Sequence, residues 1–173
     1  AGKSSLLSAL TNAKPKIGDY PYTTLTPQLG IIRNFEQEII ISDIPGLIKD
    51  AHKGIGIGTR FLGHVERCKA LIHVIDVTNK SPVASFKIVT KELEEYGYNL
   101  INKKQIVIIN KIDLVNKDIL QKTLQKIKKY SNMKVYSCSA SNKIGLKDIT
   151  ENLFDLLNNE KNVNKNKDEK WLP

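Results

Sequence analysis

Apolar residues follow two alternating patterns along the chain, and this alternation predicts the fold class. Short apolar runs each lead into a polar residue at 39–41, 71–75, 106–109 and 135–138. Between and after these runs, apolar residues spaced by three or four positions predict helices at 61–65, 88–96, 119–127 and 146–156. Strands that alternate with helices in this way are typical of an α/β fold with helices on both faces of a mostly parallel sheet.

The strand runs also predict where polar side chains gather. Runs that are apolar throughout are typical of parallel strands, which are buried on both faces. The residues that follow them are Asp43, Asp76, Asn110 and Ser139. Because parallel strands end at one edge of a sheet, we expect these residues at the carboxyl edge, where open α/β sheets bind ligands.

The length of 173 residues fits one domain with a buried core, which we expect to span residues 1–160. The Lys- and Asn-rich residues 161–173 are expected to form a disordered tail. No apolar run approaches the roughly 20 residues of a membrane-spanning helix. Cys68 and Cys138 belong to no C-x-x-C pattern, so we expect reduced thiols in a cytosolic protein rather than a metal site or a disulfide.

The formal charge of +9 is compatible with two kinds of surface. Lysine outnumbers arginine 24 to 3 and asparagine occurs 15 times, which is typical of a compositional bias that fills a solvated surface with lysine. Part of the excess also lies in the tail. The same excess is typical of a protein that contacts RNA, and both interpretations stay open.

The first five residues match the second half of the phosphate-binding loop G-x-x-x-x-G-K-[ST], which follows a strand and opens a helix. Lys3 is then placed for the β- and γ-phosphates of a nucleotide, and the Ser4 hydroxyl for Mg²⁺. Leu6, Leu7 and Leu10 share one face of the predicted helix. The sequence begins inside this motif, so we expect the first strand of the sheet to be missing and the fragment to be less stable without it.

Two further segments have the residues that a triphosphate site needs. Asp43-Ile44-Pro45-Gly46 follows an apolar run, and D-x-x-G there puts a carboxylate near Mg²⁺ through water and a glycine N–H against the γ-phosphate. Residues 20–27 contain two prolines and three threonines. This composition is expected of a loop that gives a Thr hydroxyl to Mg²⁺ and a backbone N–H to the γ-phosphate. Taken alone, each segment also fits an ordinary turn or connecting loop.

Asn110-Lys111-Ile112-Asp113 is the most discriminating segment of the chain. The Asp113 carboxylate can accept two hydrogen bonds from the N1–H and the exocyclic amine of guanine, a pair of donors that adenine lacks. A carboxylate left unpaired there is costly, so such a site rejects the wrong base. Asn110 is expected to brace the neighbouring loops, and the Lys111 stem to cover the plane of the base.

Three other features carry less information. Ser139-Ala140-Ser141 is expected to bring the Ala140 N–H to the guanine O6. The glycines of 54–58 lack the dinucleotide spacing G-x-G-x-x-G and are interpreted as a hinge that changes with the nucleotide state. The histidines have no ligand-like spacing and are interpreted as packing or surface residues: His52, His64 and His73.

With these residues in view, the chain resembles the G domain of the Obg (or CgtA) family of bacterial GTPases, which has the three-layer, Ras-like P-loop NTPase fold. Residues 12–25, NAKPKIGDYPYTTL, are similar to that family's switch I. Residues 43–48 with the glycines through Gly58, followed by Arg60-Phe61-Leu62 and His64-Val65-Glu66-Arg67, are similar to its switch II region.

The resemblance implies a cytoplasmic, monomeric GTPase that binds GTP and GDP with Mg²⁺. It also implies contact with the large ribosomal subunit or its rRNA late in assembly, and a link to growth and stress control. In the family a glycine-rich domain precedes the G domain. The implied Mg²⁺ ligands are Ser4 and Thr24, with Asp43 acting through water. The implied nucleotide-binding residues are Ala1, Gly2, Lys3, Ser4, Ser5, Tyr22, Thr23, Thr24, Leu25, Thr26, Asp43, Ile44, Pro45, Gly46, Asn110, Lys111, Ile112, Asp113, Ser139, Ala140 and Ser141, of which Lys3, Thr24 and Gly46 are catalytic.

Leu47 predicts slow hydrolysis, since many GTPases have a Gln there that orients the attacking water and a Leu side chain cannot hydrogen-bond. We therefore expect a timer or checkpoint with an intrinsic rate below about 1 s⁻¹. Two alternatives remain. One is a ribosome- or RNA-binding module that works without nucleotide, and the other is an ATPase of the same superfamily, against which Asp113 argues.

Overall fold

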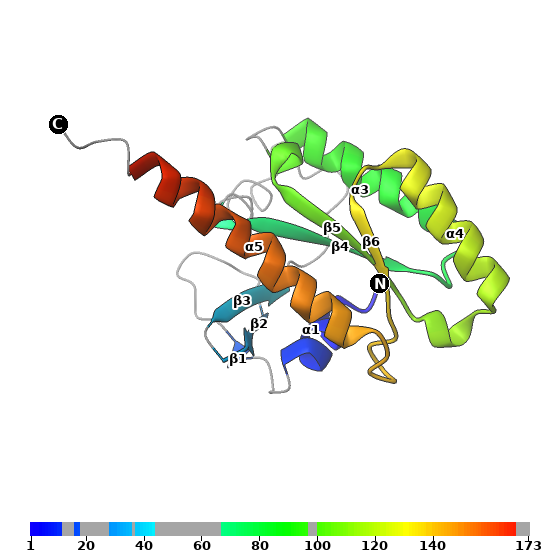
Figure 1. Cartoon of the computed structure of the whole chain (residues 1–173). Helices are drawn as coiled ribbons and strands as arrows, with labels where there is room; N and C mark the ends of the chain where they lie inside the picture. Colours follow the sequence, from blue (N-terminus) through cyan, green and yellow to red (C-terminus); the bar gives the residue numbers. More distant parts are fainter. Residues whose placement is uncertain (12–15, 18–27, 36, 44–66, 97–99, 169–173) are drawn as a thin grey trace.

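In the described part of the computed structural model, helices pack against two three-stranded sheets (Figure 1). The structure describes residues 1–11, 16–17, 28–35, 37–43, 67–96 and 100–168. The strands are β1 (Lys16–Ile17), β2 (Gln28–Arg33), β3 (Glu38–Asp43), β4 (Ala70–Asp76), β5 (Lys104–Asn110) and β6 (Lys134–Ser137). The α-helices are α1 (Lys3–Thr11), α3 (Pro82–Tyr96), α4 (Lys117–Tyr130) and α5 (Leu146–Asp168), and the short 3₁₀ helices are η2 (Leu100–Asn102) and η3 (Ile112–Leu114).

Strands β4, β5 and β6 form a parallel sheet, as the sequence predicts. In the register of this sheet Asp76 lies opposite Asn110, and Ile109 lies opposite Ser137. The polar residues that end the three strands therefore meet at one edge, which confirms the expected carboxyl edge for this half of the fold.

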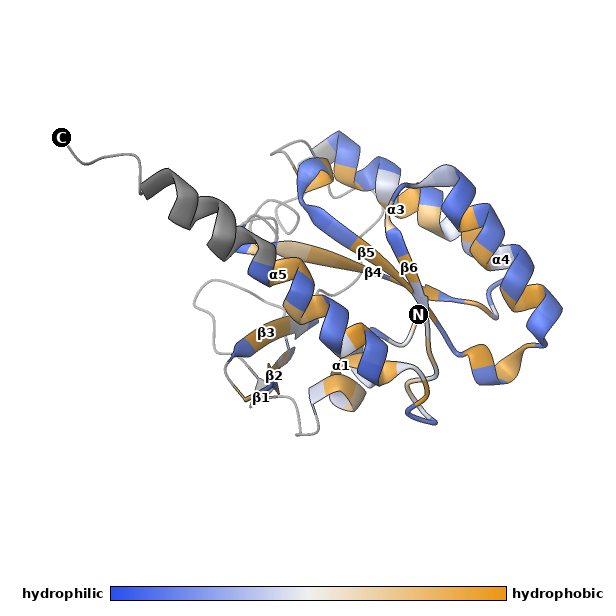
Figure 2. Ribbon diagram, viewed as in Figure 1, coloured by the Kyte–Doolittle hydropathy of each residue, from blue (hydrophilic) through white to orange (hydrophobic). Residues whose placement is uncertain are grey.

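Alternate residues of β5 pack into two separate cores, one on each face of the sheet. Ile106 and Ile108 belong to a cluster with residues of α1 and α5. Val107 and Ile109 belong to a second cluster, with residues of α3 and α4. Figure 2 shows apolar β4 and β5 between helices whose outer surfaces are hydrophilic. The result is the predicted three-layer α/β architecture, and the parallel strand at its centre is buried on both faces.

The other sheet differs from the prediction, because β3 is not a parallel strand. Strand β2 pairs with both β1 and β3, and both pairings are antiparallel. On β3, Ile39 is 8% exposed whereas Ile40 is 69% exposed, so only one face of this strand is buried. A run of three isoleucines does not distinguish a half-buried antiparallel strand from a fully buried parallel one. The expectation for 39–41 was therefore right about the strand and wrong about its pairing.

Three of the four predicted helices are confirmed, and the fourth segment, 61–65, lies outside the described residues. Helix α5 differs at its end, since it continues to Asp168 although the sequence predicts a disordered tail from residue 161. The first half of α5 is anchored by the buried Ile149, Leu153 and Phe154. Residues 169–173 lie outside the described residues.

His73 is a buried packing residue, as expected. It lies on β4 with 6% exposure, its ring is 5.8 Å from the Phe86 ring, and its Nε2 is 2.6 Å from Gln105 Oε1. Burial lowers the pKa of His73, and the contact with Gln105 opposes that shift only in part. His52 and His64 lie outside the described residues. In the described ranges, no helix has the length and apolar character that crossing a membrane requires.

We expect Gly30→Ala to destabilise the packing of α1 on β2. A Cβ atom at Gly30 would lie 2.3 Å from Thr11 Cγ2 and 2.8 Å from Leu7 Cδ1, both buried residues of α1. Overpacking of this kind should lower the free energy of unfolding by about 1–3 kcal/mol in urea titrations. Ser8→Ala, at an exposed position of the same helix, is the control and should change it by less than about 0.5 kcal/mol. Equal stability of Gly30→Ala and the wild type would contradict this account of the packing.

Candidate nucleotide site

The side chain of Asn110 connects three segments at the carboxyl edge of the parallel sheet. It is 2% exposed, and its Nδ2 donates to Ala1 O at 3.3 Å. Its Oδ1 accepts from Lys111 N at 2.8 Å and from Ala140 N at 3.0 Å. The Cys138 thiol also donates to this oxygen at 3.5 Å. The predicted phosphate loop, base-reading motif and Ser139–Ser141 segment therefore meet on one buried amide, which is the bracing role expected for Asn110.

Gly2 lies directly beneath this amide. Its φ is +76°, a conformation that favours glycine. A Cβ atom at this position would lie 2.8 Å from Asn110 Nδ2 and 3.9 Å from Lys111 Cε. Gly2 O accepts from Leu6 N at 2.9 Å, so α1 begins immediately after this turn and Lys3 is its first residue. The N-terminus of α1 is a favourable environment for a phosphate, as the motif predicts.

Lys111 is held by a residue to which the sequence assigned no role. Its backbone is left-handed, with φ 68°, and its Nζ is 2.5 Å from Asp76 Oδ2. Asp76 Oδ1 accepts from Thr78 N at 2.9 Å and from Thr78 Oγ1 at 2.6 Å. Desolvation raises the pKa of Asp76, but the hydrogen bonds from Lys111 and Thr78 outweigh it and lower the pKa to about 2. The only feature of the sequence that could have indicated this role of Asp76 was its position at the end of a predicted strand.

The base-reading motif continues into η3. Ile112 N donates to Cys138 O at 3.2 Å, and Leu114 N donates to Lys111 O at 3.1 Å. These bonds fix the backbone on both sides of Asp113, whose side chain is exposed. Burial raises the pKa of the Cys138 thiol to about 11, so this cysteine is a neutral donor, in keeping with the reduced thiol that we expected.

The segment Ser139–Ser141 lies beside the motif, and its contact with guanine stays a prediction. The Ala140 N–H, which the sequence analysis assigned to the guanine O6, donates to Asn110 Oδ1. The sequence alone did not indicate that the Asn110 oxygen would compete for this donor. Ser139 forms two backbone hydrogen bonds with Ile144, and its Oγ lies 3.1 Å from Ser141 Oγ. A contact with O6 would require this N–H to be shared or to move.

Two of the three residues predicted to hold Mg²⁺, Ser4 and Asp43, meet where β3 ends near the start of α1. The Ser4 hydroxyl donates to Asp43 Oδ2. Asp43 Oδ1 is buried and has no hydrogen-bond partner within the described ranges. A carboxylate oxygen in that position suits a water-mediated contact with a hard cation. No cluster of three or more His, Cys, Asp or Glu that could hold a metal occurs among the described residues.

Several predicted site residues cannot be compared with the structure. The segment 22–26, which includes Thr24, and the residues 44–46 and Leu47 lie outside the described residues, as do the glycines of 54–58. Of the phosphate-loop residues, Lys3 is half-buried, and Ser4 and Ser5 are exposed.

We expect Asp76→Asn to weaken the attachment of Lys111. The substitution keeps the oxygen that accepts from Thr78 but removes the charge paired with Lys111, whose side chain is 38% exposed. After allowance for screening by solvent, the free energy of unfolding should fall by about 1 kcal/mol at pH 7. Because the folded pKa of Asp76 lies below its ordinary value of 3.8, this contribution is present above that value and is lost as the pH falls towards 2. Urea titrations at pH 7 and pH 3 test this, and a variant as stable as the wild type at pH 7 would contradict it.

Solved structures of GTP-binding proteins have the same fold as the chain. The G domain of the FeoB iron transporter of T. maritima aligns with a TM-score of 0.68 at 21% identity, over 90% of this chain and 91% of that one. A putative nucleolar GTP-binding protein 1 from Plasmodium falciparum aligns with a TM-score of 0.67 at 18% identity, over 98% and 87%. Era from Aquifex aeolicus, bound to GDP·AlF4⁻, aligns with a TM-score of 0.65 at 24% identity, over 90% of this chain and 52% of that one. These likenesses establish the P-loop GTPase fold.

Curated relatives named GTPase Obg are more similar in sequence. The protein from Aquifex aeolicus is 48% identical over 158 residues, and the one from Zymomonas mobilis is 47% identical over 156 residues. These alignments cover 89% and 90% of this chain but only 46% and 45% of the relatives, so the chain spans about half their length. The resemblance to Obg is thereby confirmed. Residues 1–111 also match the family described as 50S ribosome-binding GTPase. The chain therefore belongs to the 50S ribosome-binding GTPase family.

Proposed function

We propose that the chain binds guanine nucleotides with Mg²⁺ and hydrolyses GTP to GDP as a nucleotide-dependent switch. The observation that supports this most strongly is the buried Asn110 side chain, which joins Ala1, Lys111 and Ala140. In a nucleotide site these three segments would contact the phosphates, the base plane and the base edge. Because Asn110 already holds these three segments together, one nucleotide could contact all of them without a prior rearrangement of the chain.

Guanine would be selected by Asp113. Its exposed carboxylate can accept hydrogen bonds from N1–H and the exocyclic amine, and the backbone bonds of Ile112 and Leu114 hold η3 in position. The pairing of Lys111 with Asp76 orients the aliphatic stem that would cover the base. Adenine offers neither of the two donors that the carboxylate requires, which argues against the ATPase alternative.

Ser4 and Thr24 would ligate Mg²⁺ directly, and Asp43 would bind it through water. The unpaired Asp43 Oδ1 and the contact of Ser4 with Asp43 support this assignment for two of the three residues. The ion would neutralise charge on the β- and γ-phosphates. Lys3, Thr24 and the Gly46 N–H would bind the γ-phosphate, and Leu47 would leave the attacking water without a side-chain partner, which supports slow intrinsic hydrolysis.

We extend the proposal to the assembly of the large ribosomal subunit, with a role in growth and stress control in the cytoplasm. This part is supported by the description of the family as 50S ribosome-binding and by the relatives named GTPase Obg. Binding to the subunit or its rRNA would then depend on whether GTP or GDP is bound. A ribosome- or RNA-binding module that works without nucleotide is the remaining competitor.

Titration of the chain with a fluorescent guanine nucleotide and Mg²⁺ tests the proposal. The wild type should bind, and Asp113→Ala should weaken binding by at least about 100-fold, because two hydrogen bonds to a charged acceptor are lost. Asp118→Ala is the matched control, since it removes the same charge from an exposed position five residues away and should leave affinity unchanged. The absence of binding, or equal competition by ATP and GTP, would contradict the proposal.

A further inference from the structure

The positive charge of the chain is concentrated in residues 101–150. This segment contains eleven lysines and three aspartates, a formal charge of +8, whereas the whole chain carries +9. The segment forms β5, α4 and β6 and the beginning of α5. The excess that composition alone left open therefore belongs mainly to one region of the fold and not to the tail.

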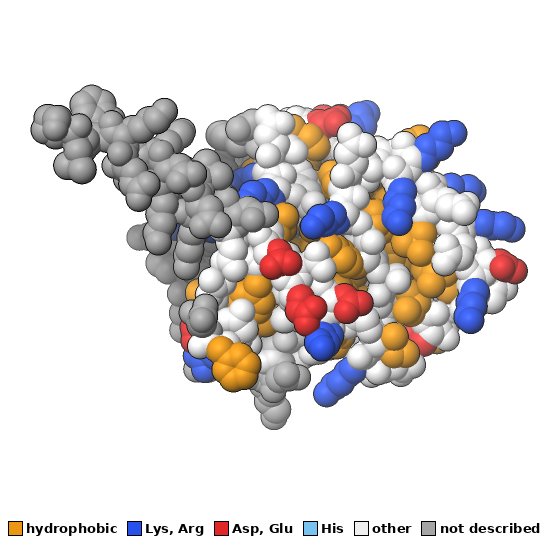
Figure 3. All heavy atoms as spheres, viewed as in Figure 1, with side chains coloured by type: hydrophobic (Ala, Val, Ile, Leu, Met, Phe, Trp, Pro, Cys, Tyr) orange, Lys and Arg blue, Asp and Glu red, His pale blue; other side chains and the backbone are white. Residues whose placement is uncertain are grey.

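Helix α4 presents much of this charge to solvent. Its buried side is formed by Thr123 and Ile127. Its exposed lysines are Lys117, Lys122, Lys126, Lys128 and Lys129, against one acidic residue, Asp118. No ion pair recorded within the described ranges involves these five lysines. Figure 3 shows lysine side chains spread along the α4 side of the molecule with few acidic ones among them.

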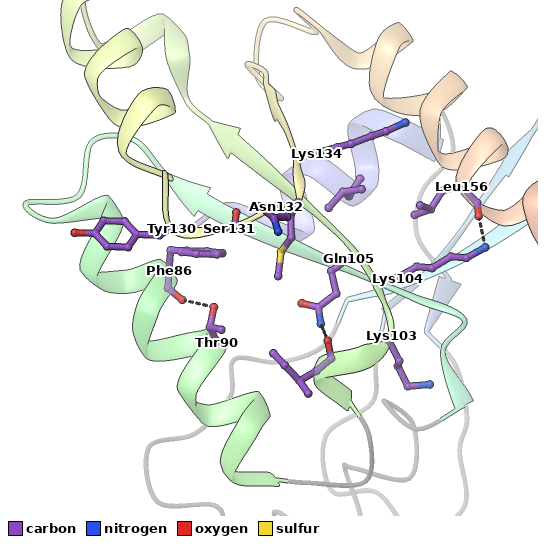
Figure 4. A pocket seen from close by; sticks show the side chains of 13 residues that line it. Phe86, Thr90, Lys103, Lys104, Gln105, Tyr130, Ser131, Asn132, Lys134 and Leu156 are labelled. Carbon is purple, nitrogen blue, oxygen red and sulfur yellow. Dashed lines mark hydrogen bonds between the residues drawn. The ribbon is translucent and has the colours of Figure 1, made fainter. Parts of the chain in front are cut away.

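An open cavity of about 450 Å³ lies at the end of α4, at the amino edge of β5 and β6. This is the opposite edge of the sheet from the nucleotide site. Figure 4 shows side chains from α3, β5 and the α4–β6 connection around it, with an aromatic side formed by Phe86 and Tyr130. Its polar and charged lining includes Asn132, Lys103 and Lys134. Phe86 is only 3% exposed, so of these two aromatic residues Tyr130, at 54%, is the accessible one.

Two of its lysines are oriented by the backbone. Lys103 Nζ donates to Cys68 O at 2.6 Å, and Lys104 Nζ donates to Leu156 O at 2.8 Å. These contacts hold the side chains of Lys103 and Lys104 in fixed positions at the cavity.

Tyr130 connects the cavity to the charged helix. It is the last residue of α4, is 54% exposed, and has Lys87 Nζ 3.7 Å from its ring centroid. The acidic residues of α3 are Glu92, Glu94 and Glu95, and Glu95 pairs with Lys91 at 3.5 Å. An exposed aromatic ring beside several ammonium groups is the combination that binds an unpaired base together with its flanking phosphates.

We infer that the exposed face of α4 and the adjoining cavity form a binding surface for single-stranded RNA. The phosphates would lie along Lys122, Lys126 and Lys129, and one unpaired base would stack at Tyr130. With 14 residues, α4 is about 21 Å long, so its lysines extend beyond the reach of a single mononucleotide and favour a polymer. The surface does not use the nucleotide site, so this inference stands or falls separately from the proposed GTPase activity.

Fluorescence anisotropy with a labelled, unstructured 12-nucleotide RNA tests the inference on the full chain. Lys122→Glu/Lys126→Glu should weaken binding by at least about tenfold and should reduce the slope of log K against log salt by about 1.4, the value for two phosphate contacts on a single strand. Tyr130→Ala should weaken binding by about 5- to 150-fold. The matched control is Lys143→Glu/Lys147→Glu, which makes the same charge change at exposed positions near the start of α5 and should alter affinity by less than about threefold. Thermal melting monitored by circular dichroism shows that each variant is folded.

Several results would overturn the inference. One is that the folded wild type does not bind the RNA. Another is that the two double variants lower RNA affinity equally, which would indicate non-specific electrostatic attraction. Unchanged affinity of Tyr130→Ala would also overturn it, as would binding to phosphatidylserine vesicles without binding to RNA. Loss of guanine-nucleotide binding with RNA binding intact would count against the proposed GTPase function and leave the RNA surface standing.

Discussion

The arrangement of the site depends on one buried amide. Asn110 ends the central parallel strand and is 2% exposed, so its donors and acceptors must be satisfied within the protein. Its oxygen accepts from the backbone of Lys111 and Ala140, and its nitrogen donates to Ala1. Segments more than a hundred residues apart are thereby fixed to one side chain. Loss of that amide would leave buried N–H groups unpaired, which is costly.

The strand that bears Asn110 is itself held from both sides. Ile106 and Ile108 pack towards α1 and α5, and Val107 and Ile109 pack towards α3 and α4. Burial on both faces restricts the strand more than burial on one face would. The charged pair of Lys111 and Asp76 joins the ends of neighbouring strands at the same edge. Hydrophobic burial thus fixes the platform, and a few polar contacts at its rim determine the chemistry. The lysine-rich helix α4 covers one face of the same sheet.

Much of this could be predicted from the sequence, because periodicity and motif order are local properties. The runs at 71–75 and 106–109 and the helices at 88–96, 119–127 and 146–156 were predicted correctly, and the hydrogen bonds of Asn110 agree with its expected bracing role. What failed depended on distant partners. The pairing of Ile39–Ile41 with an antiparallel neighbour is not encoded in any short window. The hydrogen bond from the Ala140 N–H to a side chain 30 residues away is not encoded there either, and the contact of this N–H with the guanine O6 stays a prediction. The Asp76–Lys111 pair was missed for the same reason, although Asp76 was already noted at a strand end. The clustering of charge on α4 became visible only when a continuous stretch of sequence was seen as one exposed helix face.

Amide hydrogen exchange, followed by NMR in the wild type and in Asn110→Ala, tests the central role of this side chain most directly. The N–H groups of Lys111 and Ala140 both donate to its Oδ1. If Asn110 holds the site together, both should lose protection in the variant, by at least about tenfold, while Ile108 in the centre of β5 remains protected. If Lys111 and Ala140 stay as protected in the variant as in the wild type, the segments are held by something else and the account is wrong.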